Sequence, residues 1–250
     1  EVKMKINSVE KYFQNISIKY KENFSTTKSS KNYVFRNRKK IVLDLLQKKR
    51  GNFLDIATGS GEITAEIIKK NNFNKITLVD ISKKMLKKMK SKTKKIKMIK
   101  KIKFIKADFS SLTFKDKFDY IICLGILAHF PSNKIFFEKL NEMSKKGTII
   151  ILQSSLLNFP TNRINKIIFS NRYNKRFNYK INHITEEKLK YFFERYGFEV
   201  IAEKKYSVSI PLLDKIVPSL NYYIDSIFDK LFPSIGSEGI FLLKKKWKKI

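Results

Sequence analysis

The stretch NFLDIATGSG, residues 52–61, decides the fold. Its first six residues are mostly apolar and have the length of a buried strand, and the glycines at 59 and 61 mark a tight turn. Ile63, Ile67 and Ile68 follow at helical spacing. A strand, a glycine-containing turn and a helix predict a parallel α/β unit, in which a ligand approaches the turn backbone and the helix amino terminus.

Strands alternate with amphipathic helices along most of the chain. Apolar runs predict further strands at 75–80, 102–107, 118–124, 147–152, 198–207 and 239–245. Ser82, Ser132 and Thr185 each precede a helical apolar pattern and are typical N-cap residues. This alternation predicts an α/β fold with a parallel sheet in a single domain of residues 1–250.

The segments outside this alternation are predicted to be helical caps and insertions. Residues 1–49 form N-terminal cap helices, 50–152 the cofactor-binding core and 184–207 its continuation. Residues 153–183 lack a clear period and are interpreted as an insertion without a sheet element. Residues 208–235 form a helical lid that Pro218 splits in two, and 236–250 hold the last strand and a basic tail.

Charge is the most conspicuous feature of the composition. The 250 residues include 54 Lys plus Arg and 22 Asp plus Glu, a formal charge of +32. Lysines outnumber arginines 47 to 7, although arginine is better suited to two-point recognition of phosphate and guanine. We therefore interpret most of the charge as a solvated lysine surface, which disfavours a nucleic-acid partner and also suits acidic acceptors or anionic membranes.

Several classes of protein are excluded or disfavoured by simple counts. The single cysteine, Cys123, excludes an internal disulfide framework, and with only two histidines no metal site is predicted. No apolar run approaches the ~20 residues of a membrane span, and the first ten residues lack a signal-peptide centre. The expectation is a soluble, cytoplasmic protein.

Asp80 is the best-placed ligand for a ribose. It ends the second predicted strand, nineteen residues beyond Gly61, where an acid can accept both ribose hydroxyls. A nicotinamide dinucleotide enzyme shares this arrangement, but its G-x-G-x-x-G fingerprint fails here because Thr64 occupies the last position.

Four segments in order closely resemble the motifs of class I S-adenosylmethionine-dependent methyltransferases. They are residues 54–61 (LDIATGSG), 78–82 (LVDIS), 106–109 (KADF) and 118–125 (FDYIICLG). The resemblance covers roughly residues 30–152 and 185–245 and is greatest to the small-molecule branch, which includes quinone, tetrapyrrole and sugar-tailoring enzymes. It implies a Rossmann-like, doubly wound sheet of seven strands with an antiparallel last strand, and S-adenosyl-L-methionine as cofactor.

The same resemblance implies roles for individual residues. The methionine end of the cofactor lies beside Asp55 and Gly59, with Ala57 and Thr58 in the same turn, and Gly61 makes a helix packing contact. The remaining assignments are Asp80 and Ile81 at the ribose, Asp108 and Phe109 at the adenine, and Leu124 and Gly125 at the methyl-donating end. A cap helix in such enzymes often places an arginine over the cofactor carboxylate; Arg36 is the candidate, and Arg38 is the alternative.

His129 is the candidate catalytic base, because many small-molecule members have a histidine after the fourth strand. The competing interpretation is a histidine that packs against the loop. His183 is interpreted as a surface or structural residue and Cys123 as a core residue.

The predicted function is methyl transfer to a small-molecule acceptor, with oxygen as the expected site of methylation. An RNA methyltransferase of the same fold and a cofactor-binding protein without turnover remain as alternatives. The apolar stripe of residues 212–232 packs in the core or the lid, docks on a membrane surface or forms a dimer contact, in decreasing order of preference. The sequence does not fix the oligomeric state.

Overall fold

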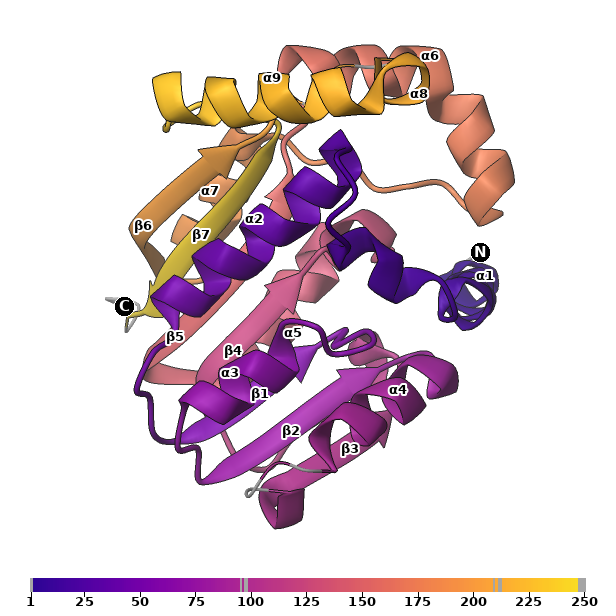
Figure 1. Ribbon diagram of the computed structural model, residues 1–250. Helices are drawn as coiled ribbons and strands as arrows, with labels where there is room; N and C mark the ends of the chain where they lie inside the picture. Colours follow the sequence, from indigo (N-terminus) through magenta and orange to yellow (C-terminus); the bar gives the residue numbers. More distant parts are fainter. Residues whose placement is uncertain (1, 95, 97–98, 209, 211–212, 247–250) are drawn as a thin grey trace.

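The computed structural model describes residues 2–94, 96, 99–208, 210 and 213–246. One seven-stranded sheet runs through the molecule in the order β3-β2-β1-β4-β5-β7-β6 (Figure 1). Strands β1 to β5 are parallel, and β7 pairs antiparallel with both β5 and β6. The predicted doubly wound sheet with an antiparallel last strand is therefore confirmed. The strands are β1 (Asn52–Ile56), β2 (Lys75–Asp80), β3 (Ile102–Lys106), β4 (Phe118–Leu124), β5 (Ser144–Ser155), β6 (Phe198–Tyr206) and β7 (Glu238–Lys245).

Helices cover both faces of the sheet, and short 3-10 turns follow several strands. Ser82, Ser132 and Thr185 cap their helices through the side-chain oxygen, as predicted. The helices are α1 (Val2–Ile16), α2 (Ser30–Leu45), α3 (Thr64–Lys70), α4 (Lys83–Thr93), α5 (Asn133–Met143), α6 (Pro160–Phe177), α7 (Glu186–Arg195), α8 (Leu213–Ile216) and α9 (Pro218–Leu231). The 3-10 turns are η1 (Tyr20–Phe24), η2 (Ile99–Lys101), η3 (Phe109–Ser111) and η4 (Leu127–His129).

Two apolar cores lie on opposite faces of the sheet because successive strand residues point to opposite sides. Phe53 and Ile122 pack with α2, α3 and α4, whereas Leu54, Ile121 and Cys123 pack with α5 and α7. All five side chains are fully buried. Burial on both faces explains why these strands are continuous apolar runs in the sequence.

The prediction for residues 153–183 was wrong about the sheet, and it gave no bounds for a helix. Residues 153–155 continue β5, where they pair with β7, and residues 160–177 form the 18-residue helix α6. Among the side chains that the structure describes on helix α6, those of Ile164, Ile167 and Ile168 are all exposed. Because these isoleucines do not pack against the sheet, they give no helical period directed at it, and the sequence did not reveal the helix.

The preferred interpretation of the stripe at 212–232 was also wrong. Pro218 does separate two helices, α8 and α9, as predicted. However, Asn221 and Asp225 form the buried side of α9, while Leu220, Ile227 and Leu231 are exposed. Residues 209, 211 and 212 of the predicted lid and residues 247–250 of the predicted basic tail lie outside the described residues.

Among the described residues, no helix combines the length and the apolarity that crossing a bilayer requires.

Candidate cofactor and acceptor site

A cavity of about 1140 Å³ lies at the carboxyl ends of the parallel strands. Chain segments after β1, β2, β3, β4 and at the end of β5 line its floor, and α1, η1, α2 and the end of α6 cover it. The strand order reverses beside β1, because β2 and β3 lie on one side and β4 and β5 on the other. Ligands in doubly wound sheets bind at such a switch point, and this cavity exceeds the roughly 300–1000 Å³ of common small-molecule pockets.

The turn after β1 approaches the cavity through its backbone. Ala57 and Gly59 line it, with left-handed φ angles of 62° and 57°. Tyr20 of η1 covers Gly59, since a Cβ placed on that glycine lies 3.6 Å from the Tyr20 ring. Gly61 does not line the cavity: a Cβ there lies 1.9 Å from the sulfur of Met89, so this glycine allows α4 to pack against the turn.

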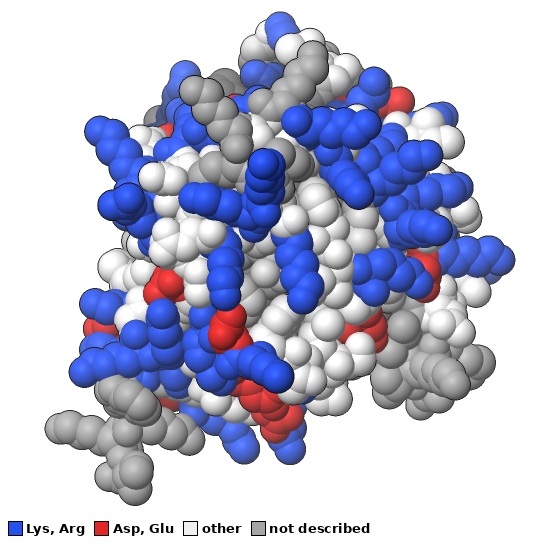
Figure 2. All heavy atoms as spheres, turned by 90° about the horizontal axis from the view of Figure 1, so that it is seen from below, with Lys and Arg blue, Asp and Glu red and all other residues white. Residues whose placement is uncertain are grey.

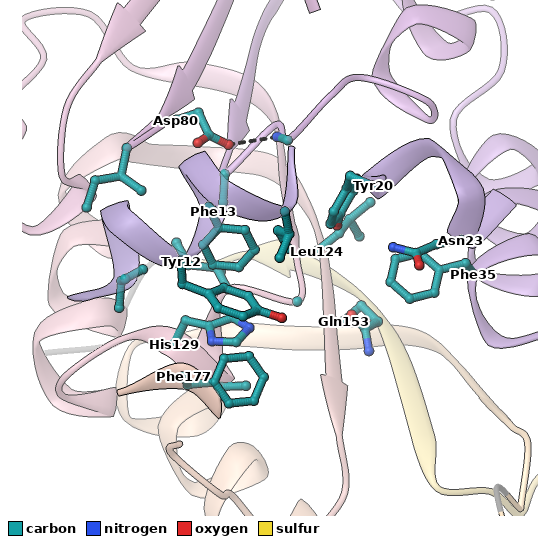
Figure 3. A pocket seen from close by; sticks show the side chains of 18 of the residues that line it. Tyr12, Phe13, Tyr20, Asn23, Phe35, Asp80, Leu124, His129, Gln153 and Phe177 are labelled. Atoms are coloured by element: carbon teal, nitrogen blue, oxygen red, sulfur yellow. Dashed lines mark hydrogen bonds between the residues drawn. The ribbon is translucent and has the colours of Figure 1, made fainter. Parts of the chain in front are cut away.

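Asp80 is held in place at the end of β2 by two backbone donors. Its Oδ2 accepts from the N–H of Gly59 at 2.8 Å (Figure 3). Its Oδ1 accepts from the N–H of Ser82 at 2.8 Å. Burial raises the pKa of Asp80 to about 6, although these two donors oppose the shift. An ionised carboxylate has about four lone-pair sites, so Asp80 retains capacity for a ligand's hydroxyls. Ile81 lies beside it on the cavity wall.

Asp55 lies beneath the turn and not on the wall of the main cavity. Its carboxylate accepts from the hydroxyl of Thr64, and together with Thr58 and Gly61 it lines a small adjoining pocket. Burial raises the pKa of Asp55 to about 7. We conclude that Asp55 and Thr58 support the turn from below, whereas Ala57 and Gly59 form its ligand-facing side.

The predicted adenine residues lie at the end of β3. Asp108 lines the cavity and caps η3, where it accepts from the N–H of Ser110 at 3.0 Å. The ring of Phe109 packs into the core, 5.8 Å from Phe130 and 5.6 Å from Phe136 between ring centroids. Because the ring is committed to the core, the backbone of Phe109 is the part best placed to contact a ligand.

Arg36 was the wrong choice between the two cap arginines. Arg36 is exposed and does not line the cavity, whereas Arg38 is 9% exposed and does. Two residues along a helix correspond to about 200° of rotation, so only one of the pair can face the sheet. Arg38 stacks 4.8 Å from the ring centre of Phe35 and pairs with Glu238 at 3.9 Å.

Polar side-chain atoms of Arg38 and Gln153 lie close to Gly125, which is next to Leu124 on the cavity wall. A Cβ on Gly125 lies 3.5 Å from Nη1 of Arg38 and 3.6 Å from Oε1 of Gln153. Among the described residues, the buried Nε of Arg38 donates no hydrogen bond and the buried Oε1 of Gln153 accepts none. Buried polar atoms of this kind are costly unless a ligand or water satisfies them.

His129 lies in an aromatic part of the cavity, at the end of η4. Its ring centre is 5.0 Å from Phe13 and 5.5 Å from Phe177, and Tyr12 is 4.5 Å from Phe177. Its Nδ1 is hydrogen-bonded to the hydroxyl of Tyr179 at 2.8 Å. Figure 3 shows these rings gathered around the imidazole. The sequence pointed to His129, but it did not reveal Phe177 because it did not reveal helix α6.

Comparison with known proteins identifies the class. Residues 47–197 match the methyltransferase-domain family, which is more than half of the chain. The chain therefore belongs to that family, whose members take a methyl group from S-adenosylmethionine. The predicted enzyme class and cofactor are confirmed. No curated protein sequence is detectably similar to the chain.

Solved structures agree with this fold. Magnesium protoporphyrin IX methyltransferase from Synechocystis PCC 6803, with bound SAH (S-adenosylhomocysteine), has 14% identity and a TM-score of 0.65, covering 97% of this chain and 100% of that one. A Thermotoga maritima protein described as a possible histamine N-methyltransferase has 16% identity and a TM-score of 0.66, covering 95% and 100%. A methyltransferase in complex with the Haloferax volcanii Trm112 activator has 13% identity and a TM-score of 0.67, covering 94% and 98%.

The cavity fits the family's cofactor. Asp80 offers a carboxylate for the ribose, and Gly59 and Gly125 on the cavity wall have no side chain to keep a ligand from the backbone. The unpartnered guanidinium nitrogen of Arg38 and amide oxygen of Gln153 suit a carboxylate and an ammonium group, respectively. An amino acid joined to an adenosine carries all of these groups.

Proposed function

We propose that this methyltransferase modifies a small, ring-containing, largely apolar acceptor at an oxygen atom. The observation that carries the proposal is the aromatic enclosure around His129, built by Tyr12, Phe13 and Phe177. Aromatic side chains bind apolar rings through their faces and edges, and they exclude water from the reacting atoms.

Separate groups of residues are proposed to bind the cofactor and to orient the acceptor. S-adenosylmethionine, when bound, supplies a methyl group already activated on a sulfonium sulfur. Asp80 holds the ribose and Arg38 the carboxylate, while Leu124 and Gly125 line the side from which the acceptor approaches. The aromatic enclosure orients the acceptor's nucleophilic atom in line with the methyl group, and such positioning supplies much of the rate enhancement.

His129 is proposed to take the proton that the acceptor hydroxyl loses. Burial raises the pKa of Tyr179, so its phenol stays protonated and neutral. When Nδ1–H of His129 donates to the oxygen of Tyr179, the lone pair of the imidazole lies on Nε2. Tyr179 is proposed as a positioning residue that holds the imidazole ring through this hydrogen bond.

The distribution of charge favours a small acceptor over RNA. Figure 2 views the molecule from below, the end away from α6 and α9, and lysine and arginine side chains are spread over that face. A strand-binding enzyme concentrates cations along a groove that leads to its active site. Here the segments that cover the cavity are α1, η1, α2 and α6, and they contribute many aromatic side chains to its lining.

The test is transfer of a tritiated methyl group from S-adenosylmethionine into a cell extract that is then separated into organic-soluble small molecules, RNA and protein. We expect label in the small-molecule fraction with the wild type and at least a 100-fold lower rate with His129→Gln, within the range for loss of a general base. Label in RNA establishes the RNA-modifying alternative. Binding of S-adenosylhomocysteine without label in any fraction establishes a binding protein without turnover.

A further inference from the structure

The outward sides of α6, α8 and α9 form an apolar surface at one end of the molecule, here called the α6–α9 surface. Figure 1 shows the three helices together along that end. Its most exposed members are Ile167 of α6 at 79%, Ile216 of α8 at 76% and Leu231 of α9 at 66%. Ile168, Leu220 and Ile227 are also about half exposed. Large apolar patches on a soluble protein mark a contact with another apolar body.

Helix α9 is oriented with its polar side toward the protein. Asp225 accepts from the hydroxyl of Ser207 at 2.9 Å and from the N–H of Val208 at 2.7 Å. Asp229 accepts from the hydroxyl of Tyr33 at 2.7 Å and from the N–H of Ser207 at 2.7 Å. These bonds fix the rotation of the helix, so its apolar stripe is held outward by the fold.

The same bonds remove negative charge from the outer side. All three carboxylates of residues 213–235 accept from the body of the protein, since Asp214 accepts from the N–H of Ser30 at 2.7 Å. Residues 160–177 contain no acidic residue at all. Exposed cations border the apolar side chains, among them Arg163 and Lys166 of α6 and Lys230 of α9. The surface thus presents apolar and positive groups together.

We propose that the α6–α9 surface docks the enzyme on an anionic lipid bilayer. Positive charge next to exposed apolar side chains matches the combination of headgroup charge and acyl-chain boundary at such a membrane. Self-association through the same surface is disfavoured, because it brings together two chains of formal charge +32. Charge attracts the protein to the membrane from any side, and the apolar side chains select this end.

Docking at this surface places the membrane close to the covered cavity. The carboxyl end of α6 contributes Phe177 to the cavity lining. Ser30, whose hydroxyl is bonded to Asp225 of α9, is followed by Lys31, which also lines the cavity. An apolar acceptor dissolved in the bilayer therefore reaches the active site along a short path.

The experiment measures co-sedimentation of the purified protein with vesicles of neutral phosphatidylcholine, with and without 25% phosphatidylglycerol, at physiological salt. The test variant is Ile227→Asp/Leu231→Asp. The matched control is Ile135→Asp/Ile201→Asp, which makes the same changes at exposed isoleucines on α5 and β6. Thermal unfolding and S-adenosylhomocysteine binding show that both variants are folded, and analytical ultracentrifugation gives their oligomeric state.

We expect the wild type and the control to bind the anionic vesicles, the test variant to bind at least tenfold more weakly, and all three to be monomeric. Equal weakening of both variants shows that charge alone attaches the protein and overturns the proposed surface. A wild-type dimer that the test variant dissociates assigns the surface to a second copy. A wild type that is monomeric and does not bind the vesicles leaves a partner protein as the occupant of the surface. Both this result and the dimer overturn docking on lipid. None of these outcomes depends on the proposed acceptor.

Discussion

Arg38 and Arg36 offer a paired test of how the cofactor is held. Arg38→Ala removes the guanidinium that faces Gly125 and the cavity, whereas Arg36→Ala removes an exposed one two residues away. A hydrogen bond to a charged group is worth about 1.5–3 kcal/mol, which corresponds to roughly 10- to 150-fold in affinity. We expect Arg38→Ala to weaken the binding of S-adenosylhomocysteine by that factor and Arg36→Ala to change its affinity by less than about twofold.

The assay is titration calorimetry with two ligands. S-adenosylhomocysteine carries the amino acid group, and 5′-methylthioadenosine lacks it, so only the first ligand should lose affinity in Arg38→Ala. Removal of Arg38 also leaves Glu238 without its cation, and Arg38→Lys, which keeps the charge, separates that effect from ligand binding. Equal weakening of both ligands, or no weakening of either, refutes the assignment of Arg38 to the carboxylate.

Variants of Tyr179, Asp55 and Gly61 test the base, the buried acid and the turn. Tyr179→Phe should reduce kcat less than His129→Gln does and should shift the lower limb of the pH–rate profile, whereas an unchanged profile contradicts the positioning role. Burial raises the pKa of Asp55 from 3.8 to about 7, so between these pH values the folded state binds more protons than the unfolded state. The stability of the wild type therefore falls as pH rises through this range, and Asp55→Asn avoids that loss. Urea unfolding at pH 4.5 and 7.5 should show the stability of Asp55→Asn relative to the wild type growing with pH by roughly a few kcal/mol. Gly61→Ala should destabilise the protein by about 3 kcal/mol or more, because it combines backbone strain with a steric clash against Met89. Gly147→Ala is the control: it has a similar φ of 85° but open space around the added Cβ, and it should cost only about 1–2 kcal/mol. Equal losses of stability contradict the packing role of Gly61.

The sheet was predictable because each strand gives a local signal in the sequence, a short apolar run. The boundaries at 75–80 and 118–124 match β2 and β4 to the residue, since each is a largely apolar run of buried and half-buried side chains with a lysine at its start, Lys75 within β2 and Lys117 before β4. The residues that line the cavity from strand ends were predictable for the same reason: topology alone brings Asp80, Asp108 and Gly125 to one edge.

The helices on the periphery were not predictable in this way, because long-range partners fix their orientation. Nothing near Asp225 and Asp229 in the sequence shows that Ser30, Tyr33 and Ser207 bind them, so the apolar stripe of α9 was expected to face inward. The ambiguity between the two cap arginines has the same origin, since the rotation of α2 depends on what it packs against.

A crystal structure with S-adenosylhomocysteine shows how the cofactor is held. We expect the ribose hydroxyls on the carboxylate of Asp80, the ligand carboxylate on the guanidinium of Arg38, and the sulfur facing the aromatic enclosure around His129. A ligand bound in the opposite direction, with its amino acid group at Asp108, or one bound outside this cavity, contradicts this arrangement.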